Sequence, residues 1–157
     1  KAAQEGFAVK RQIIYVSAED SVNKKYWIDD AGKTFEVKLG SILEEHIQIT
    51  NPKKNHFVAV TIPLAAGLEY LNPALKTASE DFTPSGKTTS TGSYSAFYDD
   101  RIVYYFEQMP PGTYDFYFRV RATTEGSFTQ PPARAELMYQ QNIYGNSPGT
   151  EIKVVSE

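Results

Sequence analysis

Cysteine is absent from this 157-residue chain, and tryptophan occurs once. Without cysteine the chain can form no disulfide, no thiolate zinc site and no cysteine nucleophile, although the redox compartment stays open because exported bacterial proteins also often lack cysteine. The only histidines are His46 and His56. Chemistry that depends on imidazole therefore has two candidates.

Long apolar runs are also missing. The most apolar stretch, Val58 to Gly67, is interrupted by Pro63 and has half the roughly 20 residues that a membrane-spanning helix needs. Charge is nearly balanced, with 16 Lys and Arg against 19 Asp and Glu. No dense basic run could neutralise a phosphate backbone, so nucleic acid is not an expected partner.

What is abundant is aromatic and β-prone sequence. Aromatic residues make up 13% of the chain, with 11 Tyr and 9 Phe, a bias typical of half-buried strands. Alternating or continuous apolar runs predict strands at Phe7–Val16, Phe35–Leu39, Ile42–Thr50, Phe57–Ile62, Ile102–Phe106, Tyr114–Ala122 and Glu151–Val155. We therefore expect an all-β fold, a two-sheet antiparallel sandwich over residues 1–157, with one short helix near Ala74–Ser79.

Turn signals separate several of these runs. We expect turns at Asp30–Lys33, Asn51–Asn55 and Pro110–Gly112, because Gly, Pro, Asn and Asp favour turn conformations. The Ser-, Thr- and Gly-rich stretch Ala78–Ser95 predicts a long surface loop. Tyr114, just after Pro110–Gly112, is placed like the tyrosine corner of immunoglobulin-like sandwiches, where a phenol hydrogen-bonds nearby backbone.

The clearest strand is Tyr114–Ala122, which should lie inside a sheet. Its even-numbered residues are apolar and define one buried face. The opposite face carries Tyr117, Arg119 and Arg121. Tyr and Arg are frequent interface anchors, so this face is either a binding surface or a second buried sheet face with solvated arginines.

A search for catalytic and metal sites finds no complete constellation. In the Ile42–Thr50 strand His46 falls opposite the apolar face, and we predict that His46 and His56 are solvated surface residues. Asp29-Asp30 and Asp99-Asp100 lack the spaced ligands of a calcium loop, so turn capping or pairing with Arg101 is the favoured interpretation. No metal, cofactor or enzymatic activity is predicted, although paired glycosidase carboxylates would be invisible in one sequence.

One segment carries a resemblance to a known family. It runs from Pro131 to Tyr139 as Pro-Pro-Ala-Arg-Ala-Glu-Leu-Met-Tyr and is followed by Ile143-Tyr144-Gly145. Further pieces occur in order upstream, at Pro63–Glu69 with Asn72-Pro73, Asp99–Phe106, Met109–Tyr114 and Arg121–Phe128. Together they cover the chain from about Gly40 onward, and it resembles the last, tenth macroglobulin-like domain of bacterial alpha-2-macroglobulins.

The resemblance implies a non-catalytic C-terminal domain of a much larger periplasmic protein, usually held at the inner membrane by an upstream lipid anchor. Such proteins trap proteases. A protease cuts a bait region and the trap then rearranges. In some members a Cys–Gln thioester on a neighbouring domain then acylates the protease. The implied partners are the neighbouring domains and, through the full-length protein, proteases.

In that family the tenth domain shields the thioester with a segment that carries a Met-Tyr pair. Here the pair is Met138-Tyr139, and Tyr144 completes the implied locking interface. The alternative is that Met138 and Tyr139 are ordinary core or loop-anchor residues. The family commonly continues with Asp-Pro, whereas this chain has Gln140-Gln141-Asn142, which leaves the path after Tyr139 open.

Two other classes of function remain as alternatives. A carbohydrate- or protein-binding module of a surface protein would need an exposed aromatic platform, for which the single Trp27 is a thin basis. A hydrolase domain is the third hypothesis, and no motif supports it.

Overall fold

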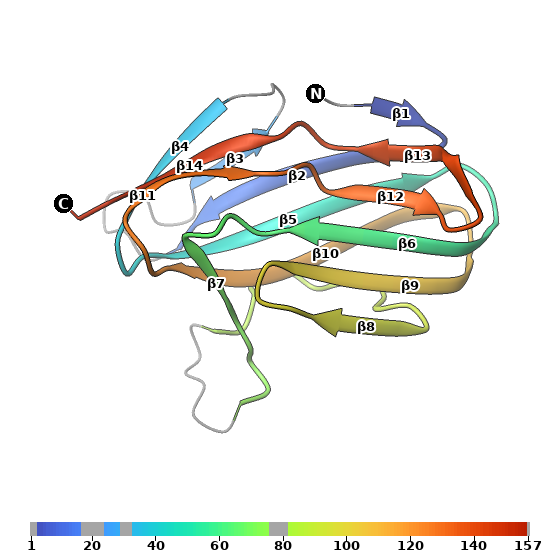
Figure 1. Ribbon diagram of the computed structural model, residues 1–157. Coiled ribbons are helices and arrows are strands. Elements are labelled where there is room, and N and C mark those ends of the chain that lie inside the picture. Colours follow the sequence, from blue (N-terminus) through green and yellow to red (C-terminus); the bar gives the residue numbers. More distant parts are fainter. Residues whose placement is uncertain (1–2, 17–23, 29–32, 76–81, 157) are drawn as a thin grey trace.

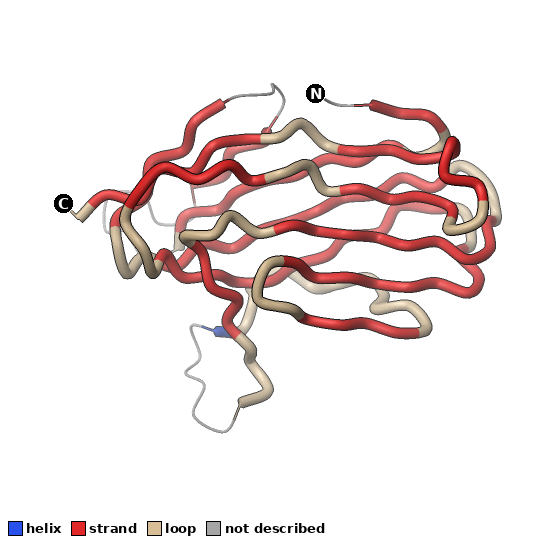
Figure 2. The backbone as a smooth tube through the Cα atoms, in the orientation of Figure 1, coloured by secondary structure: helices blue, strands red, loops and turns tan. Residues whose placement is uncertain are grey.

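The protein was analysed as a computed structural model that describes residues 3–16, 24–28, 33–75 and 82–156. Apart from a single 3-10 helical residue, Phe82, strands make up the regular structure of these residues, which confirms the predicted all-β class (Figure 2). In chain order they are β1 (Ala3–Glu5), β2 (Ala8–Tyr15), β3 (Lys24–Ile28), β4 (Lys33–Lys38), β5 (Ile42–Asn51), β6 (Asn55–Pro63), β7 (Leu68–Leu71), β8 (Tyr94–Phe97), β9 (Arg101–Met109), β10 (Gly112–Ala122), β11 (Gly126–Gln130), β12 (Arg134–Leu137), β13 (Gln140–Asn146) and β14 (Thr150–Val155).

The strands form two layers (Figure 1). One layer is a five-stranded sheet in the order β3-β2-β5-β10-β7. The other combines a six-stranded sheet, β1-β13-β12-β6-β9-β8, with a three-stranded sheet, β11-β14-β4. All neighbours are antiparallel except β14 and β4, which run parallel and so depart from the purely antiparallel sandwich that we expected.

The second layer is split because two adjacent strands break at the same level. β11 is followed by β12 and β13 by β14, with residues 131–133 and 147–149 between them. Ser147 bridges the gap: its amide donates to the carbonyl of Ala133 at 2.9 Å, and its hydroxyl accepts from the Ala133 amide at 3.0 Å. Prolines at 131, 132 and 148 supply no ladder donor, which explains the break.

The core lies between the layers and is formed by the inward faces that period-two alternation predicts. In β10, residues Tyr114, Phe116, Phe118, Val120 and Ala122 are all buried, and the strand pairs with β5 and β7. The prediction for this strand, including its internal position, is confirmed.

An ion pair also lies in this core, which strand periodicity did not reveal. Glu45 lies on the inward face of β5. Its carboxylate is 2.8 Å from Nε of Arg11, and both side chains are 1% exposed. Arg11 also donates to the carbonyl of Pro63 at 2.8 Å, and Gln130 donates to the carboxylate of Glu45 at 3.3 Å. Because a buried pair needs such additional bonds, this cluster fastens β2 and β5 to the broken layer.

The predicted turns at Asn51–Asn55 and Pro110–Gly112 are present between β5 and β6 and between β9 and β10. The tyrosine corner is also confirmed, because the hydroxyl of Tyr114 donates to the carbonyl of Pro110 at 2.6 Å. The turn predicted at Asp30–Lys33 falls mostly outside the described residues.

The predicted helix near Ala74–Ser79 also lies largely outside the described residues, and Ala74 and Leu75 form a turn and bend. Within the predicted loop Ala78–Ser95, residues 82–93 lack a strand, and β8 begins at Tyr94. No helix in the described part of the chain has the length and apolar character to cross a membrane.

Candidate functional site

Met138 and Tyr139 form the turn between β12 and β13, at the end of the sandwich where the β5–β6 and β9–β10 turns also lie (Figure 1). Both are exposed, Met138 to 38% and Tyr139 to 78%. The ring of Tyr139 meets Phe57 edge to face, with centroids 5.4 Å apart. We call Phe57, Met138 and Tyr139 the tip cluster. Of the alternative that Met138 and Tyr139 are ordinary core or loop-anchor residues, the core half is wrong.

The turn has a geometry that differs from the usual two-residue hairpin. Among described non-glycine residues only Phe57 has a positive φ, so Met138 and Tyr139 do not form a primed turn, which is the type that matches strand twist. The register adjusts next to it: Glu136 pairs with Tyr144 but Leu137 with Gln140. The residues between Gln140 and Tyr144 therefore bulge from the ladder. This bulge is the path of the chain after Tyr139, which the sequence left open.

Tyr144, the third predicted locking residue, has a different environment. It lies in β13, half-buried, with the guanidinium of Arg134 4.2 Å from its ring centroid. Arg134 is in turn 3.3 Å from Glu136. The cation–π partner of Tyr144 is therefore on β12, whereas the ring partner of Tyr139 is Phe57, which the sequence pattern presented only as the first residue of a strand.

Side-chain hydrogen bonds connect the turns at the end of the sandwich beneath the tip cluster. The side-chain amide of Asn51 donates to the carbonyls of Met109 and Pro110 at 2.9 and 3.0 Å, and its oxygen accepts from Asn55 at 2.7 Å. These bonds join the β5–β6 and β9–β10 turns, and the tyrosine corner of Tyr114 adds a further link. The cluster is thus presented from a well-supported base.

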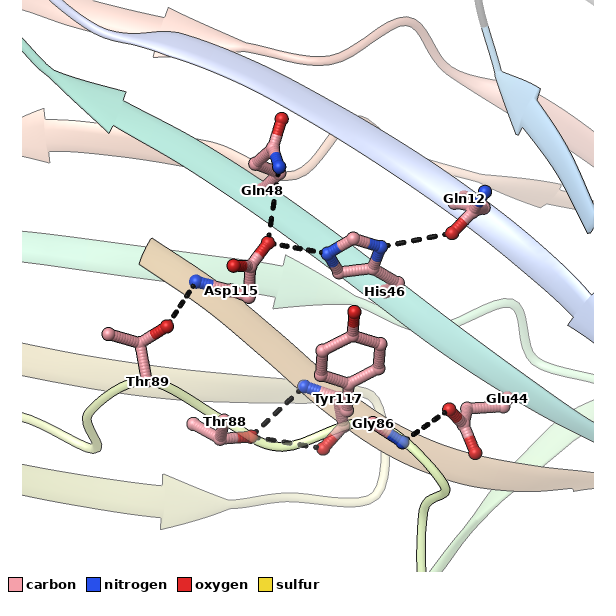
Figure 3. Close-up of polar contacts among 9 residues, drawn as sticks. All are labelled: Gln12, Glu44, His46, Gln48, Gly86, Thr88, Thr89, Asp115 and Tyr117. Atoms are coloured by element: carbon pink, nitrogen blue, oxygen red, sulfur yellow. Dashed lines mark hydrogen bonds and ion pairs between the residues drawn. The ribbon is translucent and has the colours of Figure 1, made fainter. Parts of the chain in front are cut away.

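The face that carries Tyr117, Arg119 and Arg121 is covered by the chain itself. We call residues 82–93 the strap segment. The hydroxyl of Thr88 accepts from the amide of Tyr117 at 3.0 Å, and that of Thr89 accepts from the amide of Asp115 at 2.9 Å (Figure 3). The strap segment therefore substitutes for a neighbouring strand along part of β10.

Glu44 anchors the strap segment to the sheet. Its carboxylate accepts from the amide and hydroxyl of Ser85 at 2.7 and 2.9 Å and from the amide of Gly86 at 3.1 Å. It also pairs with Nε of Arg119 at 2.9 Å. Glu44 is 0% exposed and Arg119 is 9% exposed, so of the two alternatives the buried sheet face is supported. The expectation of solvated arginines is wrong for Arg119.

Arg121 is part of the same covered face. Its guanidinium lies over the ring of Phe82, 5.5 Å from the centroid. The strap segment thus contacts Tyr117 through the Thr88 hydroxyl and Arg121 through the Phe82 ring, and it shares the Glu44 carboxylate with Arg119.

His46 is buried, and the prediction that it is a solvated surface residue is wrong. Its ring stacks on Tyr117 with centroids 4.2 Å apart, and its nitrogens lie 3.0 Å from Gln12 Oε1 and 2.7 Å from Asp115 Oδ1 (Figure 3). Both nitrogens are thus occupied by β2 and β10, which supports a structural role. His56 is exposed, as predicted.

The environment of Tyr117 disfavours ionisation of its phenol. Burial first, and then the negative charges of Asp115 and Glu44, raise the pKa of Tyr117 above its ordinary value. Since a phenol is already neutral at physiological pH, Tyr117 contributes packing and stacking there.

The remaining candidates from the sequence are the paired aspartates and Trp27. Asp100 pairs with Arg101 at 2.9 Å, as expected for the Asp99-Asp100 turn, and Asp29-Asp30 lies outside the described residues. No group of three or more His, Asp or Glu side chains in the described ranges is arranged to hold a metal ion. Trp27 is 40% exposed and lies 5.5 Å from the ring of His46.

Residues 6–142 match the family described as the Bacterial Alpha-2-macroglobulin MG10 domain, and the chain belongs to this family. It is 26% identical over 152 residues to an alpha-2-macroglobulin homolog of Nostoc sp., which covers 97% of this chain and 8% of that protein. The chain therefore spans a small part of its relative.

Solved structures agree on the fold. A Salmonella alpha-2-macroglobulin mutant, Y1175G in its own numbering, superposes with a TM-score of 0.70 at 19% identity, covering 99% of this chain and 10% of that one. Native Escherichia coli alpha-2-macroglobulin from domain MG7 to the C-terminus gives 0.69 at 17% identity, covering 98% of this chain and 24% of that one. The chain thus has the fold of a domain found within large multidomain proteins.

Proposed function

We propose that this chain is a non-catalytic domain of a bacterial protease trap, and that Met138 and Tyr139 dock on the thioester-type domain of the same protein until bait cleavage. The observation that carries the proposal is the exposure of Met138 and Tyr139 at a hairpin turn. Large apolar side chains that protrude from a surface are a common feature of interfaces.

The two side chains suit a protective contact. A thioether is flexible and fills irregular gaps, while a phenol offers a large ring with a polar edge. Together they would exclude water from a bond that water hydrolyses. The hydrogen-bonded base formed by Asn51 and Tyr114 limits the conformational entropy lost on docking.

Release of this contact would be a switch between two packings of the parent protein. Relatives of the same fold have been solved in forms activated by trypsin and by porcine elastase, which supports protease-triggered rearrangement in the full-length protein. The partners would be the neighbouring domains and, after bait cleavage, proteases.

The expected setting is the periplasm or cell envelope, with the full-length protein held at the inner membrane by a lipid anchor on an upstream segment. This placement follows from the family resemblance. Fractionation of cells that express the full-length protein would test it.

The docking role is tested by Tyr139→Ala in the full-length protein. Loss of an anchor ring should raise spontaneous amine uptake by the thioester about tenfold, because central aromatic anchors dominate interface energetics. Uptake of a labelled amine over time gives the rate.

Tyr94→Ala is the matched control, since Tyr94 is also highly exposed, at 60%, but lies on β8. An unchanged rate in Tyr139→Ala would contradict the docking role. A full-length protein that takes up no amine, before or after protease treatment, would contradict thioester shielding.

A further inference from the structure

Phe57 has an unusual backbone conformation. Its φ is +56°, the left-handed region, and it is the only non-glycine residue in the described part of the chain with a positive φ. A residue with a Cβ is sterically disfavoured there, and aromatic residues rarely adopt it. Such an outlier persists only where the surrounding structure imposes it and is often associated with function.

The strand around Phe57 is otherwise regular. His56 pairs with Gln108 and Val58 with Phe106, in the same register on both sides of the outlier. The amide of Met138 donates to the carbonyl of Phe57 at 2.8 Å. The distortion is therefore confined to one residue, which is hydrogen-bonded to the first residue of the tip turn.

Core packing does not explain the distortion. Phe57 is 47% exposed, while Val58 beside it is fully buried. The ring lies edge to face on Tyr139, with an interplanar angle of 77°. Phe57 is thus half-exposed despite its strained backbone, and it lies next to Tyr139, the most exposed aromatic residue that the structure describes.

We propose that Phe57 is a third anchor of the docking surface, held by a strained backbone so that its ring and that of Tyr139 enter one apolar pocket of the partner domain. This inference rests on the proposed function, and it adds a residue that the Met138-Tyr139 motif does not include. The edge-to-face pair fixes the direction of the Tyr139 ring before docking, so less entropy is lost on binding.

The chemistry of the partner pocket follows from the side chains of the tip cluster. A phenyl ring, a phenol and a thioether present no formal charge, so the partner pocket should be apolar and docking should depend little on salt. The domain that binds the tip cluster is the neighbouring domain that receives Met138 and Tyr139 in the proposed function. Family relatives contain far more chain than this domain, which covers 8% of the Nostoc protein.

The test uses oxidation of Met138 by hydrogen peroxide in the full-length protein, followed by mass spectrometry of the peptide. This readout needs no thioester. Met109 is 0% exposed and is an internal reference, because it reports opening of the domain itself. The variants are Phe57→Gly, Tyr139→Ala and the control Tyr94→Ala.

We expect Met138 to oxidise about tenfold faster in both Phe57→Gly and Tyr139→Ala, with Met109 and the Tyr94→Ala control unchanged. If Tyr139→Ala accelerates oxidation and Phe57→Gly does not, Phe57 is no anchor and this inference is overturned while the docking role stands. If Met138 is already as reactive in the full-length protein as in the 157-residue chain, both are overturned.

A second measurement addresses the strain. Phe57→Gly and Phe57→Ala both remove the ring, but only glycine adopts a positive φ without penalty. The 157-residue chain should therefore melt at a higher temperature with glycine than with alanine. A higher melting temperature for Phe57→Ala would overturn the claim that the backbone at this position is strained.

Discussion

The tip cluster and the strap-covered face differ in whether their large side chains are covered by other parts of the domain. On the covered face, Tyr117 and Arg119 are satisfied within the domain, by stacking on His46 and by pairing with Glu44. At the tip, Met138 and Tyr139 extend into solvent. A Tyr or Arg on the outer face of a strand is thus evidence of an interface only if no loop of the same chain covers that face.

The same comparison separates residues that stabilise the domain from residues available to a partner. Glu44 accepts three hydrogen bonds from the strap segment and also forms a buried ion pair with Arg119 of β10. The three residues of the tip cluster are joined to one another by the Phe57–Tyr139 ring contact and the Met138–Phe57 backbone hydrogen bond, and the Phe57 ring also lies 6.5 Å from that of His56. Substitutions should therefore affect folding strongly at the strap and weakly at the tip.

The largest effect is expected for Glu44→Ala in the 157-residue chain. Removing the carboxylate breaks a buried ion pair and the strap anchor, which should lower the free energy of unfolding by about 3–5 kcal/mol. Denaturant unfolding measures the change. Glu69→Ala, at an exposed position of β7, is the control and should change stability by less than about 0.5 kcal/mol; equal effects of the two would show that Glu44 does not hold the strap.

A smaller effect is expected for Gly86→Ala. A Cβ at this position would overlap the ring of Tyr117, so the strap segment must shift, at a cost of about 1–3 kcal/mol. Hydrogen exchange of the Thr89 amide, which donates to the carbonyl of Asp115 at 2.8 Å, should accelerate.

The matched control for Gly86 is Gly149→Ala. Its Cβ would meet Gln130 O at 3.5 Å, an ordinary contact, and its φ lies outside the left-handed region. If Gly86→Ala leaves exchange at Thr89 as slow as the control does, the strap is not closely fitted to Tyr117.

The smallest effect is expected for Tyr139→Ala in the 157-residue chain. The side chain is 78% exposed, so its removal should change the free energy of unfolding by less than about 0.5 kcal/mol. A loss above about 2 kcal/mol in denaturant unfolding would mean that Tyr139 supports the fold rather than a partner, and the contrast between tip and strap would fail.

Much of the fold was predictable because strand alternation is a local property. Seven strands and the tyrosine corner of Tyr114 followed from periodicity and turn residues. Strands β1, β3, β7, β8 and β11–β13 were missed. In β12 and β13 the burial does not alternate and polar residues are frequent. Such strands depend on pairing partners that a local pattern does not contain.

The site was predictable in part. The resemblance located Met138 and Tyr139, but it could not show that they protrude or that Phe57 lies against Tyr139. His46 was misplaced because alternation shows only which face of β5 it occupies. Whether His46 is open depends on the side chains that contact its ring from other strands, which are Gln12, Trp27, Asp115 and Tyr117.

By itself, the sequence determined the all-β class, the inward face of β10 and the identity of the segment at 131–145, since each depends on neighbouring residues. The tertiary structure alone decided that Glu45 meets Arg11 in the core, that the strap segment closes over Tyr117, and that the tip cluster stays exposed. Those outcomes depend on contacts between segments far apart in the chain, whose energies exist only after the sheets have paired.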